Sequence, residues 1–165
     1  MTTIAIYKDQ LEFNRSRTIA TLNDIAKQEN PLLALGWRPG PERAHLAWQL
    51  MHIGITEELF ATERLVPGTT AAYPDLVPRF KGGSTPDDDI PDVAQIRTVL
   101  EESRRHVLAT LDKFTDADLT TIFPAFKERG WTFARVLQVL CWHESHHQGQ
   151  AHITFNLYKA AYLKT

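Results

Sequence analysis

Mostly apolar residues recur at steps of three and four positions in four separate stretches of the chain. In the first stretch the repeating positions are Tyr7, Leu11, Thr18, Leu22 and Ile25. This spacing puts the side chains on one face of an α-helix, because each residue advances about 100° around the helix axis. The pattern predicts amphipathic helices over residues 4–29, 41–62, 91–114 and 133–158.

Helix-breaking and helix-capping residues mark the ends of these stretches. Asn30 and Pro31 are expected to stop the first helix, and Gly40 and Pro41 suit the cap and the first turn of the second. Thr132 is expected to cap the fourth helix. About 30 residues rich in Pro and Gly separate the second and third helices, which is long for a structureless loop in a compact domain. The length fits a crossover between helices that are not simple antiparallel neighbours.

The fold class follows from this arrangement of elements. No internal repeat, low-complexity tract or convincing pair of strands accompanies the helices. The sequence therefore predicts an all-α fold, a four-helix bundle with a long crossover connection between its second and third helices. With 165 residues, we expect one domain over residues 1–165, which is long enough to bury a substantial core.

Composition and charge narrow the classes of partner. A hydrophobic content of 43% with 23% charged residues is typical of a globular protein in water. A formal net charge of −2 gives no broad attraction for phosphate backbones or anionic membranes, so neither nucleic acid nor membrane is an expected partner. Cys141 is the one cysteine, which excludes an intramolecular disulfide, and we expect it to be a packed, inert thiol. No apolar run or signal segment is evident, so the expected location is cytoplasmic.

The histidines carry the strongest chemical signal. Three of the seven fall within five residues of the fourth predicted helix, at His143, His146 and His147. His143 and His147 point the same way about one helical turn apart, which lets two imidazoles reach one divalent metal ion. His52 lies in the middle of the corresponding face of the second helix and is able to converge on them across the bundle core. The sequence therefore predicts metal ligation by His52, His143 and His147.

Two observations favour a metal centre over ordinary packing: the apolar surroundings of His143 and His147, and the position of His52 in the middle of a facing helix. His143 and His147 share a face whose other members are largely apolar, where burying unpaired ring nitrogens costs free energy. Three neutral imidazoles around one ion would also leave coordination positions open for water or a substrate, as in catalytic sites. The competing interpretation is a plain helical bundle without a metal, in which the four-residue spacing of the two histidines is coincidental.

Several neighbours of the predicted ligands have candidate roles. Gln150 is our candidate catalytic residue, because it follows His147 by one turn and is positioned to hydrogen-bond a metal-bound water or substrate. An interhelical amide contact is its alternative role. His146 is a candidate for the border of the pocket, for a hydrogen bond to a ligand, or for simple packing. Trp48 is expected to pack like the other aromatic residues, with the wall of the pocket as its alternative role. Glu144 is expected to face a neighbouring helix or solvent rather than to act as a general base.

The motif at residues 143–150, His-Glu-Ser-His-His-Gln-Gly-Gln, resembles the signature HxxHHxGQ of the DinB/YfiT-like four-helix bundle proteins. These are the damage-inducible bacterial proteins, not the DNA polymerase of similar name. Residues 48–53 are similar to the segment that contributes the family's third histidine ligand. The resemblance covers nearly the whole chain in layout and implies His52, His143 and His147 as the metal ligands. Gln148 departs from the pattern, since many members have Arg there.

The resemblance also implies classes of activity. It implies a divalent metal, commonly zinc or nickel, and frequent homodimers, with a small molecule as substrate. Characterised relatives include thiol-dependent transferases that use low-molecular-weight bacterial thiols, and metal-dependent hydrolases. The expected function is thus a metal-dependent hydrolase or a thiol-dependent S-transferase, in which the metal activates a water or a thiol. The alternative is a non-catalytic stress-response or ligand-binding bundle. Three imidazoles suit several metals, so the sequence does not choose among them.

Overall fold

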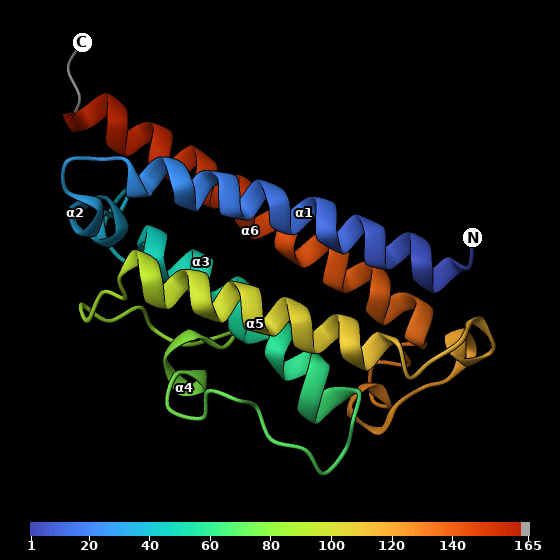
Figure 1. Cartoon of the computed structure of the whole chain (residues 1–165). Helices are drawn as coiled ribbons and strands as arrows, with labels where there is room; N and C mark the ends of the chain where they lie inside the picture. The colour runs from blue at the N-terminus through green and yellow to red at the C-terminus, as the bar shows by residue number, and fades with distance from the viewer. Residues whose placement is uncertain (163–165) are drawn as a thin grey trace.

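Four long helices pack side by side in the structure, a computed structural model that describes residues 1–162 (Figure 1). They are α1 (Thr3–Ala26), α3 (Leu46–Leu59), α5 (Val93–Leu111) and α6 (Phe133–Tyr162). Shorter elements lie between them: α2 (Pro31–Gly36), a π-helical turn η1 (Phe60–Arg64), α4 (Val77–Phe80) and the 3-10 turns η2 (Asp116–Thr120) and η3 (Pro124–Phe126). No strand occurs within the described residues, so the predicted all-α helical bundle is confirmed.

The direction of the helices explains the long connection between α3 and α5. In Figure 1, α1 and α6 run in one direction, whereas α3 and α5 run in the opposite direction. Two parallel neighbours cannot be joined by a tight turn, so the chain after α3 must return along the bundle before α5 begins. Helix α3 packs against both α5 and α6. Within residues 1–162, no helix is both long enough and apolar enough to cross a membrane.

The second long helix begins later than the sequence predicted. Residues 41–45 are not helical, and Glu42 has a positive φ of 59°, which a right-handed helix excludes. Helix α3 instead starts after His45, whose Nδ1 accepts a hydrogen bond of 3.0 Å from the backbone N–H of Trp48. The predicted roles of Gly40 and Pro41 as cap and first turn were wrong, because a histidine side chain supplies the cap.

Side-chain caps also set the other boundaries. Asn30 does more than stop α1, since its side chain accepts a hydrogen bond from Leu33 N and caps the unpredicted helix α2, with Pro31 in the first turn. Asp92 caps α5 in the same way. Thr132 Oγ1 accepts a bond of 3.4 Å from Arg135 N at the start of α6, as predicted. Side-chain oxygens therefore satisfy the first free N–H groups of these helices.

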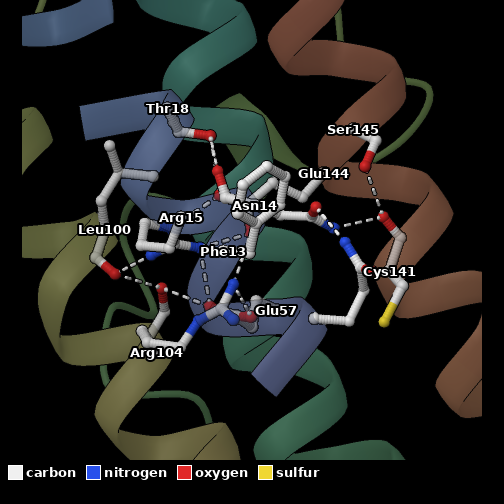
Figure 2. Close-up of polar contacts among 12 residues, drawn as sticks. Phe13, Asn14, Arg15, Thr18, Glu57, Leu100, Arg104, Cys141, Glu144 and Ser145 are labelled. Carbon is white, nitrogen blue, oxygen red and sulfur yellow. Dashed lines mark hydrogen bonds and ion pairs between the residues drawn. The ribbon is translucent and has the colours of Figure 1, made fainter. Parts of the chain in front are cut away.

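A layer of buried charges divides the core of the bundle. Arg15, Glu57, Arg104 and Glu144 come from the four long helices, and Figure 2 shows them pointing toward one another. Along α1, α5 and α6 each charged residue lies between members of two apolar clusters, one toward each end of the bundle. We call these four residues the charge cluster.

The charges in this cluster compensate one another. Arg15 binds Glu144 at 2.7 Å and Glu57 at 2.8 Å, and Arg104 binds Glu57 at 2.8 Å and also Glu144. All four side chains are at most 6% exposed. Thr18 donates a further hydrogen bond of 2.8 Å to Glu144. Two arginines and two glutamates sum to zero charge, which meets the requirement that buried charges be paired.

Candidate metal centre

The three predicted ligands converge on one point of the bundle. Each offers a ring nitrogen, and these nitrogens all lie within 4.8 Å of one another. His52 comes from α3, whereas His143 and His147 come from successive turns of α6. The ring centroids are 4.5–4.9 Å apart in all three pairs. We call this group the histidine triad.

The spacing suits one small cation. The Nε2 atoms of His52 and His143 are 3.1 Å apart. Two nitrogens that each lie ~2.0 Å from a tetrahedral zinc ion are separated by ~3.3 Å, so the observed distance requires little adjustment. All three donors are imidazole nitrogens, which zinc and nickel accept. The residues present therefore fit a divalent metal.

The backbone of the crossover selects the tautomer of His52. Its Nδ1 donates a hydrogen bond of 2.7 Å to the carbonyl oxygen of Phe80 at the end of α4. Since Nδ1 carries the proton in a neutral ring, the lone pair is on Nε2, which faces His143. Trp48 stacks on the His52 ring with centroids 4.6 Å apart and planes 12° apart. Its indole N–H donates to Arg79 O, which ties the same crossover to α3.

Gln150 contacts the third predicted ligand, His147. Its side-chain oxygen lies 3.0 Å from Nδ1 of His147, and its nitrogen lies 3.0 Å from Nε2 of His146. The pair is satisfied when His147 Nδ1 donates to the amide oxygen, which leaves Nε2 of His147 with a free lone pair. The structure thus places Gln150 against two imidazoles, on an exposed part of α6. Contact between Gln150 and a reacting group stays a prediction.

The environment keeps the triad neutral. Burial lowers the pKa of His143 to about 3, and the nearby rings of His147 and His52 add to this effect. Burial and the neighbouring imidazoles lower the pKa of His147 to about 4. The pKa of His52 is lowered by burial as well, against the opposing effect of its bond to Phe80 O. At pH 7 the three rings therefore present lone pairs rather than positive charges.

The triad forms part of the wall of a cavity of about 760 Å³. That volume lies within the usual range for small-molecule sites. His146 borders the cavity, as expected, and stacks on Trp142. Trp131 and Phe126 contribute an apolar surface, and the 3-10 turn η3 brings them near the start of α6. The side of the triad that faces this cavity is accessible to a ligand.

Other polar residues of the bundle have structural partners. His45 is fully buried, with Nδ1 capping α3 and Nε2 3.1 Å from Asp87 O. His106 pairs with the buried Glu58. Glu144 binds Arg15 on α1 and Arg104 on α5. It therefore faces neighbouring helices, which was one of the two predicted orientations, and not solvent. Burial raises the pKa of the Cys141 thiol to about 11, which agrees with an inert thiol.

Sequence reasoning missed three features of the site. The Phe80 carbonyl belongs to a connection of irregular structure, so no pattern indicated that it binds His52. Arg64 reaches the cavity from a π-helical turn, which the assumption of 100° per residue does not anticipate. Arg129 lies in a connection between helices, where an arginine ordinarily faces solvent. The aromatic residues Phe126 and Trp131 were the available signal that this connection packs as an ordered wall.

The architecture and the site together define a helical bundle with a three-histidine cluster able to hold a metal ion. A family model of the DinB superfamily matches residues 10–151, which include all three histidines. The chain therefore belongs to the DinB superfamily. No curated protein matches it.

Proposed function

We propose that this protein is a metal-dependent enzyme, a hydrolase or a thiol-dependent S-transferase. In this proposal His52, His143 and His147 hold one divalent ion, with zinc or nickel as the expected metal. The observation that carries the proposal is the convergence of three neutral ring nitrogens on the wall of a cavity of about 760 Å³. A substrate in that cavity would lie directly beside the ion.

The number of donors favours a catalytic rather than a structural ion. Structural zinc sites are closed by four protein ligands, whereas catalytic sites use three and keep a position open. Within residues 1–162 the ligand group contains three side chains. The main alternative is a non-catalytic metal-binding bundle, and it gives no reason for the open side of the triad to face a cavity.

The chain's own residues prepare the site for its chemistry. When bound, a divalent ion supplies Lewis acidity that makes a water or a thiol nucleophilic near neutral pH. The Phe80 carbonyl and the Trp48 ring hold His52 in the required orientation and tautomer. Gln150 does the same for His147. Phe126 and Trp131 give the same cavity an apolar surface.

Metal analysis is the first test. Protein purified without a histidine tag is analysed by mass spectrometry for bound metal, as wild type and as His143→Ala. His152→Ala is the matched control, because His152 lies on the same helix but is exposed. We expect about one ion per chain in the wild type and the control, and loss of the ion in His143→Ala. Substoichiometric metal that is unaffected by His143→Ala would refute the metal centre.

A pair of assays separates the two reaction types. Conjugation of electrophiles and hydrolysis of activated esters and amides are measured with and without a low-molecular-weight bacterial thiol, before and after metal removal. Turnover that needs both metal and thiol supports the S-transferase, and metal-dependent turnover without thiol supports the hydrolase and eliminates the transferase. Rates that survive complete metal removal contradict the proposal in both forms.

A further inference from the structure

The cavity beside the histidine triad has an excess of positive charge. Arg64, Lys81 and Arg129 line it, whereas Glu128 is its one acidic lining residue. The three imidazoles do not offset this excess, since they are neutral, and a divalent ion would add to it. The chain as a whole has a formal net charge of −2, so the excess is local to this cavity. A concave site with concentrated charge attracts ligands of opposite sign.

The backbone places Arg64 at the cavity by an uncommon turn. The π-helical turn η1 (Phe60–Arg64) continues α3, and Leu65 N donates to Phe60 O at 3.2 Å across it. A π-turn contains more residues than an α-turn, so it changes the direction in which the following side chains point, and such turns often occur at functional sites.

Aromatic rings in the wall of this cavity support both Arg64 and Arg129. The Arg64 guanidinium carbon lies 4.5 Å from the centre of the Phe60 ring, and Phe60 stacks on Phe126 at 5.6 Å. Phe126 stacks on Trp131 at 6.1 Å, and the Arg129 guanidinium lies 4.9 Å from the Trp131 ring. Cation–π contacts of this kind position a guanidinium without using its N–H groups.

The hydrogen-bond donors of these two arginines remain available. Each guanidinium has five N–H donors, and among residues 1–162 neither Arg64 nor Arg129 forms an ion pair. Arg79, by contrast, is paired with Asp87 and Asp89. Burial and then the charge of Arg129 lower the pKa of Arg64, and the charge of the neighbouring Glu63 only partly opposes this.

From this geometry we propose that the site takes a small organic anion whose carboxylate or phosphate group is bound by Arg64 and Arg129. The reacting part of the same molecule would then face the histidine triad across the cavity. Arginine suits this role because its planar fork matches carboxylate and phosphate oxygens in a bidentate fashion. The inference rests on the proposed function for its catalytic meaning, but binding of an anion is measurable without turnover.

Calorimetric titration with two simple probes tests the anion site. Inorganic phosphate and succinate are titrated at low ionic strength into metal-loaded and metal-free protein, as wild type, Arg64→Gln and Arg129→Gln. Loss of a charge-assisted contact should weaken binding about tenfold or more in each variant, with or without metal. Arg105→Gln is the control, since Arg105 is a 67% exposed arginine on α5, and it should bind both probes as the wild type does.

The outcomes separate this inference from the proposed function. Equal affinities in the wild type and both variants, or no binding of either probe by the wild type, would overturn the anion site even if the metal binds. Binding that depends on the two arginines in a protein that takes no metal would support the anion site and refute the metal-dependent enzyme. The probe that binds more tightly tells whether carboxylate or phosphate is preferred. Far-ultraviolet circular dichroism confirms that each variant is folded.

Discussion

Two groups of polar side chains lie within this bundle, and they differ in how their hydrogen-bonding capacity is used. In the charge cluster, each charged side chain is paired with partners on other helices (Figure 2). In the histidine triad, three lone pairs point at one another beside a cavity. A buried group whose charges are compensated internally favours one arrangement of the helices, even though Nε and Nη1 of Arg104 have no hydrogen-bond partner among the described residues. Acceptors that converge without a protein donor between them are arranged to bind a ligand such as a cation.

The two groups share the same helices. Glu144 directly follows His143 on α6, and Glu57 lies five residues after His52 on α3. Because both glutamates bind the same two arginines, the charge cluster links α3 to α6 at the level of the triad. The charge cluster therefore helps to fix the distance between His52 on α3 and the two triad histidines on α6.

The largest expected effect is the loss of stability when the charge cluster is broken. Arg104→Met removes one arginine from α5 and leaves Glu57 and Glu144 to share Arg15. Removing one partner of a buried ionic pair typically costs about 3–5 kcal/mol, because the remaining charge is left uncompensated. We expect the free energy of unfolding, measured by urea denaturation, to fall by about that amount.

Two further variants make this comparison specific. Arg105→Met changes the next residue of α5, which is 67% exposed, and should alter the free energy of unfolding by less than about 0.5 kcal/mol. His143→Ala in metal-free protein should cost much less than Arg104→Met, because no charge is stranded. If His143→Ala destabilised the metal-free protein as strongly as Arg104→Met does, the histidine triad would be as important for stability as the charge cluster, and the distinction between the two groups would be wrong.

The fold and the triad were predictable because both depend on regular helical spacing. Four apolar stripes predicted the four long helices, and the four-residue step from His143 to His147 placed two candidate ligands on one face. His52 was predictable because it occupies the core-facing stripe of its helix. The sequence suggested a crossover after the second helix, and the parallel directions of α3 and α5 account for it (Figure 1).

Features that depend on tertiary contacts were not predictable from local pattern. Arg15 and Arg104 lie on the core-facing stripes of their helices, where a charge needs a buried partner. Those partners, Glu57 on α3 and Glu144 on α6, are distant in the sequence, so no local pattern identified them. The cap by His45 was missed because histidine is not among the preferred capping residues. The direction of the Arg64 side chain depends on a π-helical turn, which the spacing of apolar residues does not indicate.

A smaller effect is expected from changing a residue that contacts the histidine triad. Gln150→Leu removes the acceptor for Nδ1 of His147 while leaving all three ring nitrogens in place. Loss of such a partner typically weakens metal binding 10- to 100-fold, because the ring loses its preferred tautomer and orientation. Competition with a chromophoric chelator measures this affinity directly.

The matched control for this prediction is Gln148→Leu on the same helix. Gln148 contacts Thr21 at 3.3 Å and has no contact with the triad among the described residues. We expect the control to bind metal as the wild type does. Equal metal affinity in Gln150→Leu and Gln148→Leu would show that the contact between Gln150 and His147 does not support ligation.

The smallest expected effect concerns His45, a buried histidine with a partner at each ring nitrogen. Burial, and then the charge of Arg38, lower its pKa below the usual value, while Asp87 and Asp88 partly oppose this. Between about pH 6.5 and the lower folded-state pKa, the unfolded chain binds more protons than the folded one. The stability that neutral His45 provides is therefore fully present above about pH 6.5 and decreases as the pH falls through this interval.

His45→Asn isolates this contribution, because asparagine retains a capping acceptor but does not titrate. Urea denaturation of metal-free protein at several pH values should give two curves that converge as the pH falls below about 6.5. Near pH 8 the variant should be less stable by about 1 kcal/mol or less, since it loses only the contact with Asp87 O. The other histidines titrate in both proteins, so they cancel from the difference. Parallel curves would mean that the pKa of His45 is not lowered by folding, which would contradict a buried, neutral His45.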